Sequence, residues 1–295
     1  MSLIRDIFAA KKAAGQPSIS FEFFPTKTPE GERTLLEKTI PALGGLKPDF
    51  CSVTYGAGGS TRETTLAIVD RIQREQHLTA MAHMTCVNAT RDETASVLAQ
   101  ARSLGIQNIL ALRGDPPGGT GEFQKTEGGF EYSYELVRFI KESGDFSIGV
   151  AGFPEGHIAQ TDGKHADWGH LKHKIEQGAD FVITQLFFNN KDYFEFRDFL
   201  TAHGVDVPLV PGIMPVLSAN QIKKMTALCG ADLPPALVSE LNKCADDEAV
   251  TQCGIDYATR QCEELLREGV PGLHFYTLNK ARATSAIVKD LNLAT

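Results

Sequence analysis

The chain has 295 residues, of which 42% are hydrophobic and 22% charged, so it can bury a sizeable core and is not disordered. Its 29 basic and 37 acidic residues give a formal net charge of −8, which argues against nucleic acid or an anionic membrane as the main partner. No stretch approaches the ~20 apolar residues of a membrane-spanning helix, and the N-terminus lacks the apolar run of a signal peptide. We therefore predict a cytoplasmic protein.

The predicted strands and helices alternate along the whole chain. The strands are Ile19–Phe24, Phe50–Thr54, Thr79–Thr85, Ile109–Leu112, Ser147–Gly152, Phe181–Gln185, Leu209–Ile213 and Leu273–Thr277. The amphipathic helices are Glu30–Leu43, Arg62–Gln73, Asp92–Leu104, Tyr134–Glu142, Leu171–Gln177, Tyr193–Ala202, Ala219–Leu228 and Ala281–Leu291. Such continuous alternation implies a parallel sheet covered by helices.

Eight strand–helix units fit a closed barrel without remainder. No G-x-G-x-x-G follows the first strand, which disfavours the alternative of an open, doubly wound sheet. The segment Cys229–Glu268 adds helix, in two pieces, between the seventh and eighth units. We predict an α/β fold, a single (β/α)₈ TIM barrel domain over residues 1–295 with extra helices between units seven and eight.

The six cysteines indicate reduced thiols, because none forms a CxxC pair. Cys244, Cys253 and Cys262 repeat every nine residues, which is two and a half helical turns, so they are predicted to alternate between helix faces and not to converge. No group of His, Asp and Glu has the spacing of metal ligands, so no metal is expected.

The chemistry of a TIM barrel lies at the C-terminal ends of its strands. Side chains alternate along a strand, so Phe21 and Phe23 should pack on the helices while Glu22 faces the barrel mouth. Apolar neighbours reduce the solvation of the Glu22 carboxylate and so favour the protonated form that a general acid needs. A buried salt bridge to a barrel Lys or Arg is the alternative.

Polar or glycine-rich segments follow other strands. Candidate residues are Thr54, Tyr55 and Ala57 after the second strand, His83 in the third, Arg113, Gly114 and Asp115 after the fourth, Phe153 and His157 after the fifth, and then Asp167, His173, Lys174 and Gln185. Each has a plain structural alternative: a tight turn for the glycines, a packing role for His83, and a solvated helix face for His173 and Lys174. Without a metal ligand set or a nucleophile elbow, these groups suggest that an organic cofactor carries the reaction.

Eight segments together resemble the methylenetetrahydrofolate reductase family. In order they are S-F-E-F-F-P at 20–25, S-V-T-Y-G-A-G at 52–58, H-M-T-C at 83–86, A-L-R-G-D-P-P at 111–117, F-P-E-G-H at 153–157, I-T-Q at 183–185, P-G-I-M-P at 211–215 and H-F-Y-T-L-N at 274–279. The chain resembles the short bacterial form, which lacks the C-terminal regulatory domain of the eukaryotic enzymes.

The resemblance implies a barrel that binds FAD and reduces 5,10-methylenetetrahydrofolate to 5-methyltetrahydrofolate with NADH or NADPH, in one-carbon and methionine metabolism. In the first half-reaction the nicotinamide reduces the flavin. In the second, Glu22 would protonate the folate ring as it opens, and the flavin would deliver hydride. Catalytic roles are thus implied for Glu22 and Asp115, with Asp115 beside the flavin and the pterin.

The resemblance also implies binding residues. FAD contacts would come from Tyr55, Ala57, His83, Arg113, Gly114, Asp115, Phe153, His157, Asp167, His173 and Lys174, with Thr54 near the nicotinamide. The substrate would be held by Gln185, Leu278 and Lys280. Phe153 stands where Tyr is common, His173 where Arg can occur, and Ala219 replaces an aromatic residue, which leaves affinity and nicotinamide preference open.

Three alternatives stay open. The same folate reduction could take its electrons from a partner protein. The chain could be a folate- or flavin-binding barrel without turnover, although a pure binder needs no proton donor such as Glu22. It could also be a flavin-free, phosphate-binding lyase or aldolase, which the lack of a Schiff-base Lys at an inward strand position disfavours. We further expect a homo-oligomer.

Overall fold

The computed structural model describes residues 1–56, 62–115 and 123–293. The strands are β1 (Ser18–Phe23), β2 (Phe50–Val53), β3 (Ala80–Thr85), β4 (Asn108–Leu112), β5 (Ser147–Gly152), β6 (Phe181–Thr184), β7 (Leu209–Val210), β8 (Gly212–Ile213) and β9 (Gly272–Tyr276). The helices are α1 (Ile4–Ala14), α2 (Pro29–Thr34), η1 (Leu35–Thr39), α3 (Ile40–Gly44), α4 (Arg62–Glu75), α5 (Arg91–Ser103), α6 (Ser133–Ser143), α7 (Lys164–Glu176), α8 (Asn190–Ala202), α9 (Ala219–Cys229), α10 (Pro235–Leu241), α11 (Asp247–Arg267) and α12 (Ala281–Asp290).

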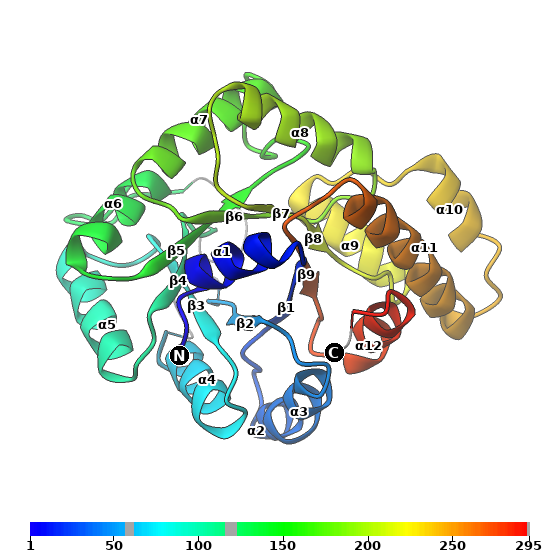
Figure 1. The fold of residues 1–295 in the computed structure, drawn as a ribbon, viewed down its shortest axis with the longest axis horizontal. Helices are drawn as coiled ribbons and strands as arrows, with labels where there is room; N and C mark the ends of the chain where they lie inside the picture. The colour runs from blue at the N-terminus through cyan, green and yellow to red at the C-terminus, as the bar shows by residue number, and fades with distance from the viewer. Residues whose placement is uncertain (57–61, 116–122, 294–295) are drawn as a thin grey trace.

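The strands form one parallel sheet in the order β7-β6-β5-β4-β3-β2-β1-β9-β8, with helices around it (Figure 1). The two edge strands, β7 and β8, are consecutive in the chain and separated by Pro211 alone. β7 pairs with β6 and β8 pairs with β9, so together they make one position of the barrel and close it. The carbonyl of Pro211 accepts the N–H of His274 at 3.0 Å. The predicted (β/α)₈ TIM barrel is confirmed.

The extra helices between units seven and eight are also confirmed. They are α10 and α11, which lie beside α9 on one side of the barrel (Figure 1). The prediction for the cysteines was wrong at one point: Cys244 lies before α11, and its thiol and that of Cys253 in α11 converge on Glu240, donating to its oxygens at 3.5 Å and 3.9 Å. The nine-residue spacing describes positions within one helix, and it does not apply to a residue in the loop before it.

Two helices differ from their predicted form. The predicted helix Glu30–Leu43 contains the π-helical turn η1, which ends just before Pro41, a residue with no N–H to donate to the preceding turn. α7 begins at Lys164, seven residues before the predicted start at Leu171. Its first two turns carry charged and polar residues around the buried Trp168, so they show no apolar periodicity.

Helix α1, which crosses the barrel in Figure 1, was not among the predicted elements. Its buried Ile4 and Phe8 pack into the barrel interior, where the Phe8 ring lies 6.0 Å from Phe50 and 5.3 Å from Phe181. The N–H of Ile4 donates to Oδ1 of Asn108, the first residue of β4, at 2.8 Å. α1 therefore closes the N-terminal end of the barrel, opposite the end where the site was predicted.

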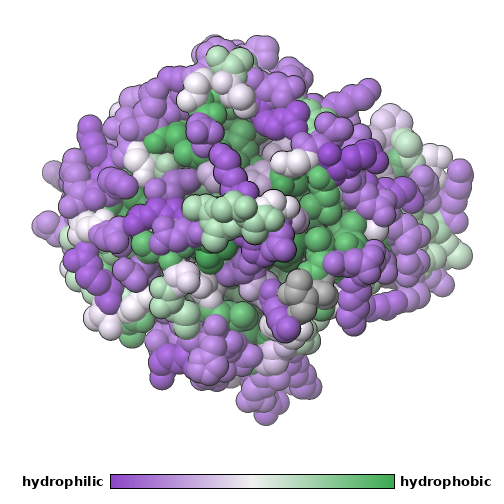
Figure 2. Space-filling model, viewed as in Figure 1, coloured by the Kyte–Doolittle hydropathy of each residue, from purple (hydrophilic) through white to green (hydrophobic). Residues whose placement is uncertain are grey.

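Strand alternation places Phe21 and Phe23 in the apolar layer between sheet and helices, as predicted, so Glu22 faces inward. On the face drawn in Figure 2, hydrophilic side chains predominate, with patches of apolar residues among them. Among the described helices, none is long and apolar enough to cross a membrane.

Candidate active site

Glu22 is the penultimate residue of β1, and only 6% of it is exposed. Its Oε2 lies 3.4 Å from Nε2 of His83 on β3 and 3.5 Å from Nε2 of His274 on β9. Burial lowers the pKa of His83 to about 4, against the attraction of Glu22, so this imidazole is neutral at pH 7. Within the described residues, the ion-pair contacts of Glu22 are to these imidazoles and not to Lys or Arg.

The backbone around Glu22 is fixed by the segment after β9. The Thr277 hydroxyl donates to the carbonyl of Glu22 at 2.6 Å. The Asn279 amide donates to the carbonyl of Phe24 at 2.8 Å and accepts its N–H at 2.9 Å. Leu278 and Asn279 both have positive φ, at 52° and 55°, which directs the chain back toward β1. Leu278 is half-buried, and Lys280 just beyond is exposed.

A second polar group lies between β5 and α7. Lys174 is half-buried and donates from Nζ to the carbonyl oxygen of Ala151 at 2.8 Å. Burial lowers the pKa of Lys174 to about 8, although the charge of Asp167 opposes this shift. Burial likewise raises the pKa of Asp167 and lowers that of His157, and these two groups attract each other. Lys174, Asp167 and His157 thus form one electrostatic group.

The residues after β4 lie near this group, because the charges of Arg113 and Asp115 both act on the imidazole of His157. The Arg113 guanidinium lies 5.2 Å from the centre of the Phe123 ring. Gly114 has φ +85°, a conformation that favours glycine, and a Cβ there would lie only 2.9 Å from Cβ of Thr85. Both the backbone conformation and the lack of space therefore disfavour any side chain at this position. Asp115 is exposed.

The structure brings some other predicted residues close to these groups. The Phe153 ring makes an edge contact with His157 at 4.7 Å between ring centres. Tyr55 accepts a hydrogen bond from Nε of Arg62 at 2.6 Å, and burial raises its pKa. Thr54 is half-buried and accepts at its carbonyl from the hydroxyl of Thr65.

Two other predicted residues, His173 and Gln185, make contacts of their own, and a third is not described. His173 is exposed on α7, where it contacts the Tyr134 ring and lies 4.0 Å from Glu176, so the structure does not bring it to the carbonyl that Lys174 reaches. Oε1 of Gln185 accepts the N–H of Leu186 at 2.9 Å. Ala57 lies outside the described residues.

His274, Thr277 and Asn279 are site residues to which sequence reasoning gave no role. All three belong to the segment H-F-Y-T-L-N, and His274 is at an inward position of β9. The alternation that identified Glu22 could have identified His274, but a strand period alone does not say which inward residues of different strands meet.

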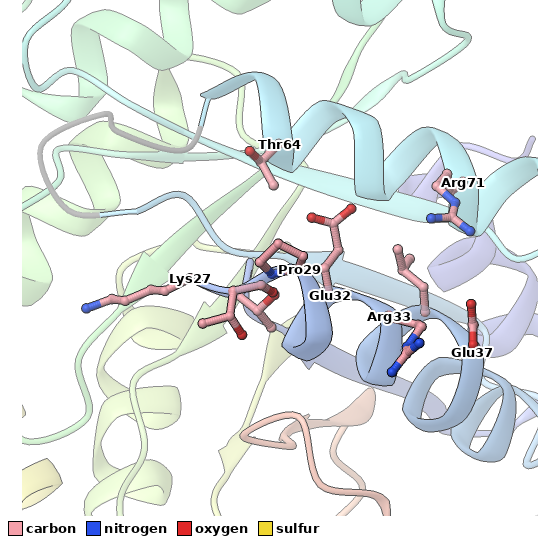
Figure 3. Close-up of a pocket in the computed structure, with 10 residues that line it drawn as sticks. Lys27, Pro29, Glu32, Arg33, Glu37, Thr64 and Arg71 are labelled. Carbon is pink, nitrogen blue, oxygen red and sulfur yellow. The ribbon is translucent and has the colours of Figure 1, made fainter.

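A polar groove of about 430 Å³ lies between the segment around α2 and helix α4 (Figure 3). Its charged lining is mixed, with Lys27, Arg33 and Arg71 against Glu32 and Glu37. None of the predicted site residues lines it. We therefore place the candidate active site at the C-terminal mouth of the barrel.

The fold and this mouth define a TIM-barrel protein with a buried carboxyl–imidazole group on β1, β3 and β9 and a second polar group, which includes Lys174, between β5 and α7. The sequence model of the family described as "Methylenetetrahydrofolate reductase" matches residues 7–292. The chain belongs to the methylenetetrahydrofolate reductase family.

Curated relatives agree with this assignment. The chain is 40% identical over 281 residues to "5,10-methylenetetrahydrofolate reductase" of Escherichia coli K12, covering 95% of this chain and 92% of the relative. It is also 40% identical over 290 residues to "Methylenetetrahydrofolate reductase (NADH) 1" of Arabidopsis thaliana, covering 95% of this chain and 49% of the relative. The chain thus spans about half the length of the plant relative.

Among solved structures, a Clostridium thermocellum protein described as binding two copies of 5-methyl-5,6,7,8-tetrahydrofolic acid has a TM-score of 0.64. It is 17% identical, and the match covers 98% of this chain and all of that one. An oxaloacetate acetylhydrolase has a TM-score of 0.51 at 12% identity, over 97% of this chain and 84% of that one. These likenesses show the barrel fold.

Proposed function

We propose that this chain reduces 5,10-methylenetetrahydrofolate to 5-methyltetrahydrofolate with NADH or NADPH, using bound FAD. The observation that carries the proposal is the buried Glu22 carboxyl at the mouth of a barrel of this family, in contact with imidazoles and without a Lys or Arg partner among the described residues. The names of the E. coli and A. thaliana relatives support the reaction, and the latter name includes NADH.

The mouth has the donors that FAD requires. Across the described ranges, Arg113 and Lys174 form no ion pair within 4.0 Å, so both cations can face a diphosphate. The buried hydroxyl of Thr85, beside Gly114, has no hydrogen-bond partner in the same part of the chain. These groups fit the cofactor, which when bound supplies hydride transfer between nicotinamide and folate. We propose that FAD is also held by Tyr55, His83, Phe153, His157 and Asp167. Thr54 is proposed to lie near the nicotinamide.

The chain's own residues then bind and protonate the substrate. Glu22 is proposed to give its proton to the folate ring nitrogen as the ring opens. The exposed carboxylate of Asp115 stabilises the cation that results. The Gln185 amide can donate and accept toward the pterin, and Leu278 and Lys280 line the folate side.

An anaerobic titration tests this function. The purified protein should be yellow; NADH or NADPH should bleach it, and methylenetetrahydrofolate should then restore the colour. Bleaching by a reduced ferredoxin but by neither nicotinamide would support the partner-protein alternative. Bleaching without recolouring would support a barrel that binds but does not turn over. A protein that is colourless after incubation with FAD and removal of the unbound flavin overturns the proposal.

We also propose a homo-oligomer that works in the cytoplasm in one-carbon and methionine metabolism, and family membership is the support for this. Sedimentation of the purified protein tests the oligomer.

A further inference from the structure

His274 joins two residues of β1 that both face the barrel interior. It is fully buried on β9, in register with Ser20. Its Nδ1 lies 2.8 Å from Oγ of Ser20, and its Nε2 lies 3.5 Å from Oε2 of Glu22. The same Ser20 hydroxyl lies 3.3 Å from the carbonyl oxygen of Leu273, to which it can donate. One imidazole therefore connects the carboxyl to a buried hydroxyl and a carbonyl.

We propose that His274 is a positioning residue for Glu22: it accepts a hydrogen bond from the protonated carboxyl at Nε2 and donates from Nδ1 to Ser20. The proposal deepens the proposed function and rests on it.

The direction of the hydrogen bonds carries this inference. A neutral imidazole has one donor and one acceptor nitrogen, and a hydroxyl donates once. If His274 is neutral, all three contacts can be made together in one order: Glu22 donates to His274, His274 to Ser20, and Ser20 to the Leu273 carbonyl. In the opposite order Ser20 donates to Nδ1, and the Leu273 contact is lost. With a neutral imidazole, the complete chain therefore has its proton on Glu22; an imidazolium would donate from both nitrogens, and the ring ¹⁵N signals distinguish the two states.

The imidazole is held in place by its neighbours. The Phe50 ring stacks on it with ring centres 6.1 Å apart and planes at 21°, and the Tyr276 ring meets it edge-on at 5.5 Å. Tyr276 is itself fixed, because its hydroxyl donates to the carbonyl of Thr184 at 2.5 Å. A ring packed in this way keeps Nε2 directed at Glu22, as positioning requires.

The other titratable groups at this place do not supply the same contact. Tyr276, on β9, has a pKa well above its usual value because of burial, so it is neutral, and its hydroxyl is already bonded to Thr184. His83, on β3, is neutral at pH 7; its Nε2 lies 3.4 Å from Oε2 of Glu22 but makes no hydrogen bond among the described residues. Of the two imidazoles near Glu22, His274 is thus the one whose other nitrogen, Nδ1, is held in place, by its contact with Ser20.

Two matched variants test the role. In His274→Gln the amide reaches the place of Nε2 and can still accept from Glu22; in His274→Asn the amide reaches the place of Nδ1 and keeps only the bond to Ser20. Both should be reduced by NADH like the wild type. Flavin reoxidation by methylenetetrahydrofolate should fall about 10²-fold in His274→Asn, the usual cost of a misplaced catalytic group, and less in His274→Gln. Equal losses in both half-reactions, or the reverse order of the variants, would overturn the proposal.

Histidine ring ¹⁵N NMR of the unmutated holoprotein gives a second readout that does not depend on activity. The His274 signals, assigned by their loss in His274→Gln, should show the Nδ1–H tautomer. Glu22→Gln should shift the Nε2 signal, whereas the remote control Glu155→Gln should not. An Nε2–H tautomer, or no response to Glu22→Gln, contradicts the proposal. If the wild type fails to reduce folate, the proposed function fails, while the NMR result still decides the hydrogen-bond chain.

Discussion

Lys174 of α7 donates from its ammonium group to the carbonyl oxygen of Ala151 on β5 at 2.8 Å. This bond holds a cation at the end of a barrel strand without an ion-pair partner within 4.0 Å among the described residues. The position suits a diphosphate, and it leads to a first prediction.

Lys174→Ala should weaken FAD binding and leave the fold intact, because it removes one positive charge facing the diphosphate. Lys172→Ala is the matched control, since Lys172 lies on the same helix but pairs with Glu176. FAD binding to the wild type should also weaken as the pH rises through about 8, where Lys174 loses its charge. Fluorescence titration with FAD measures both effects. Equal affinity of the Lys174 variant and the wild type at all salt concentrations rules out the assignment.

Asp115→Asn should raise the flavin reduction potential and slow folate reduction. A carboxylate near the flavin disfavours its anionic reduced form and stabilises a cationic folate intermediate. The charge of Asp115 acts on His157, which places it at this mouth. Dye-coupled potentiometry and stopped-flow absorbance measure the two quantities. If the reduction potential and the rate of folate reduction are both unchanged, Asp115 neither tunes the flavin nor stabilises the folate cation.

Glu22→Gln separates the two half-reactions. The amide keeps the shape of the side chain but cannot give up a proton, and hydride transfer from nicotinamide needs no such donor. Reduction of the flavin should therefore proceed at a comparable rate. Reoxidation by methylenetetrahydrofolate should fall by ~10²–10⁴-fold, the usual contribution of general acid–base catalysis. Stopped-flow absorbance resolves the steps, and an equal loss in both would make Glu22 a structural residue.

Glu155→Gln should stabilise the protein at alkaline pH. The carboxyl of Glu155 is half-buried and accepts the N–H of Asp232 at 2.9 Å, and burial is the main reason that its pKa rises to about 7. Because this pKa is above the unfolded value, the wild type loses stability as the pH rises from about 4.5 through about 7.

The Gln variant still accepts from Asp232 but does not ionise. The free energy of unfolding of Glu155→Gln minus that of the wild type should increase by on the order of 1 kcal/mol from pH 5 to pH 8.5. This figure is reduced for solvent screening, because Glu155 is half-buried. Urea denaturation at the two pH values measures it. The same difference at both pH values would contradict the raised pKa of Glu155.

Phe8→Ala should destabilise the barrel by about 3–5 kcal/mol, because it empties the space between Phe50 and Phe181. Phe8 is 4% exposed and packs in the barrel interior, so its contribution to the stability of the fold does not depend on the residues at the barrel mouth. Thermal denaturation should show a lower Tm. Lys12→Ala, on an exposed position of the same helix, is the control, and a similar Tm for both variants would mean that α1 does not seal the barrel.

Local patterns in the sequence determined the strands, most helices and the face of each strand. The alternation around Glu22 was sufficient to direct it inward, because a strand period depends only on neighbouring residues. Local patterns did not predict α1, because its apolar residues are buried only when the barrel has formed around them. They also grouped His173 with Lys174, because adjacency in sequence does not show that neighbours on a helix point in different directions.

Only the tertiary structure decided which inward residues meet. Glu22 and His274 are 252 residues apart, and their contact depends on the register of β1 against β9. That register depends in turn on barrel closure, where the chain changes strand partner across Pro211. Sequence periodicity fixes the direction of a side chain relative to its own strand, whereas the distance between side chains on different strands is set by the packing of the whole barrel.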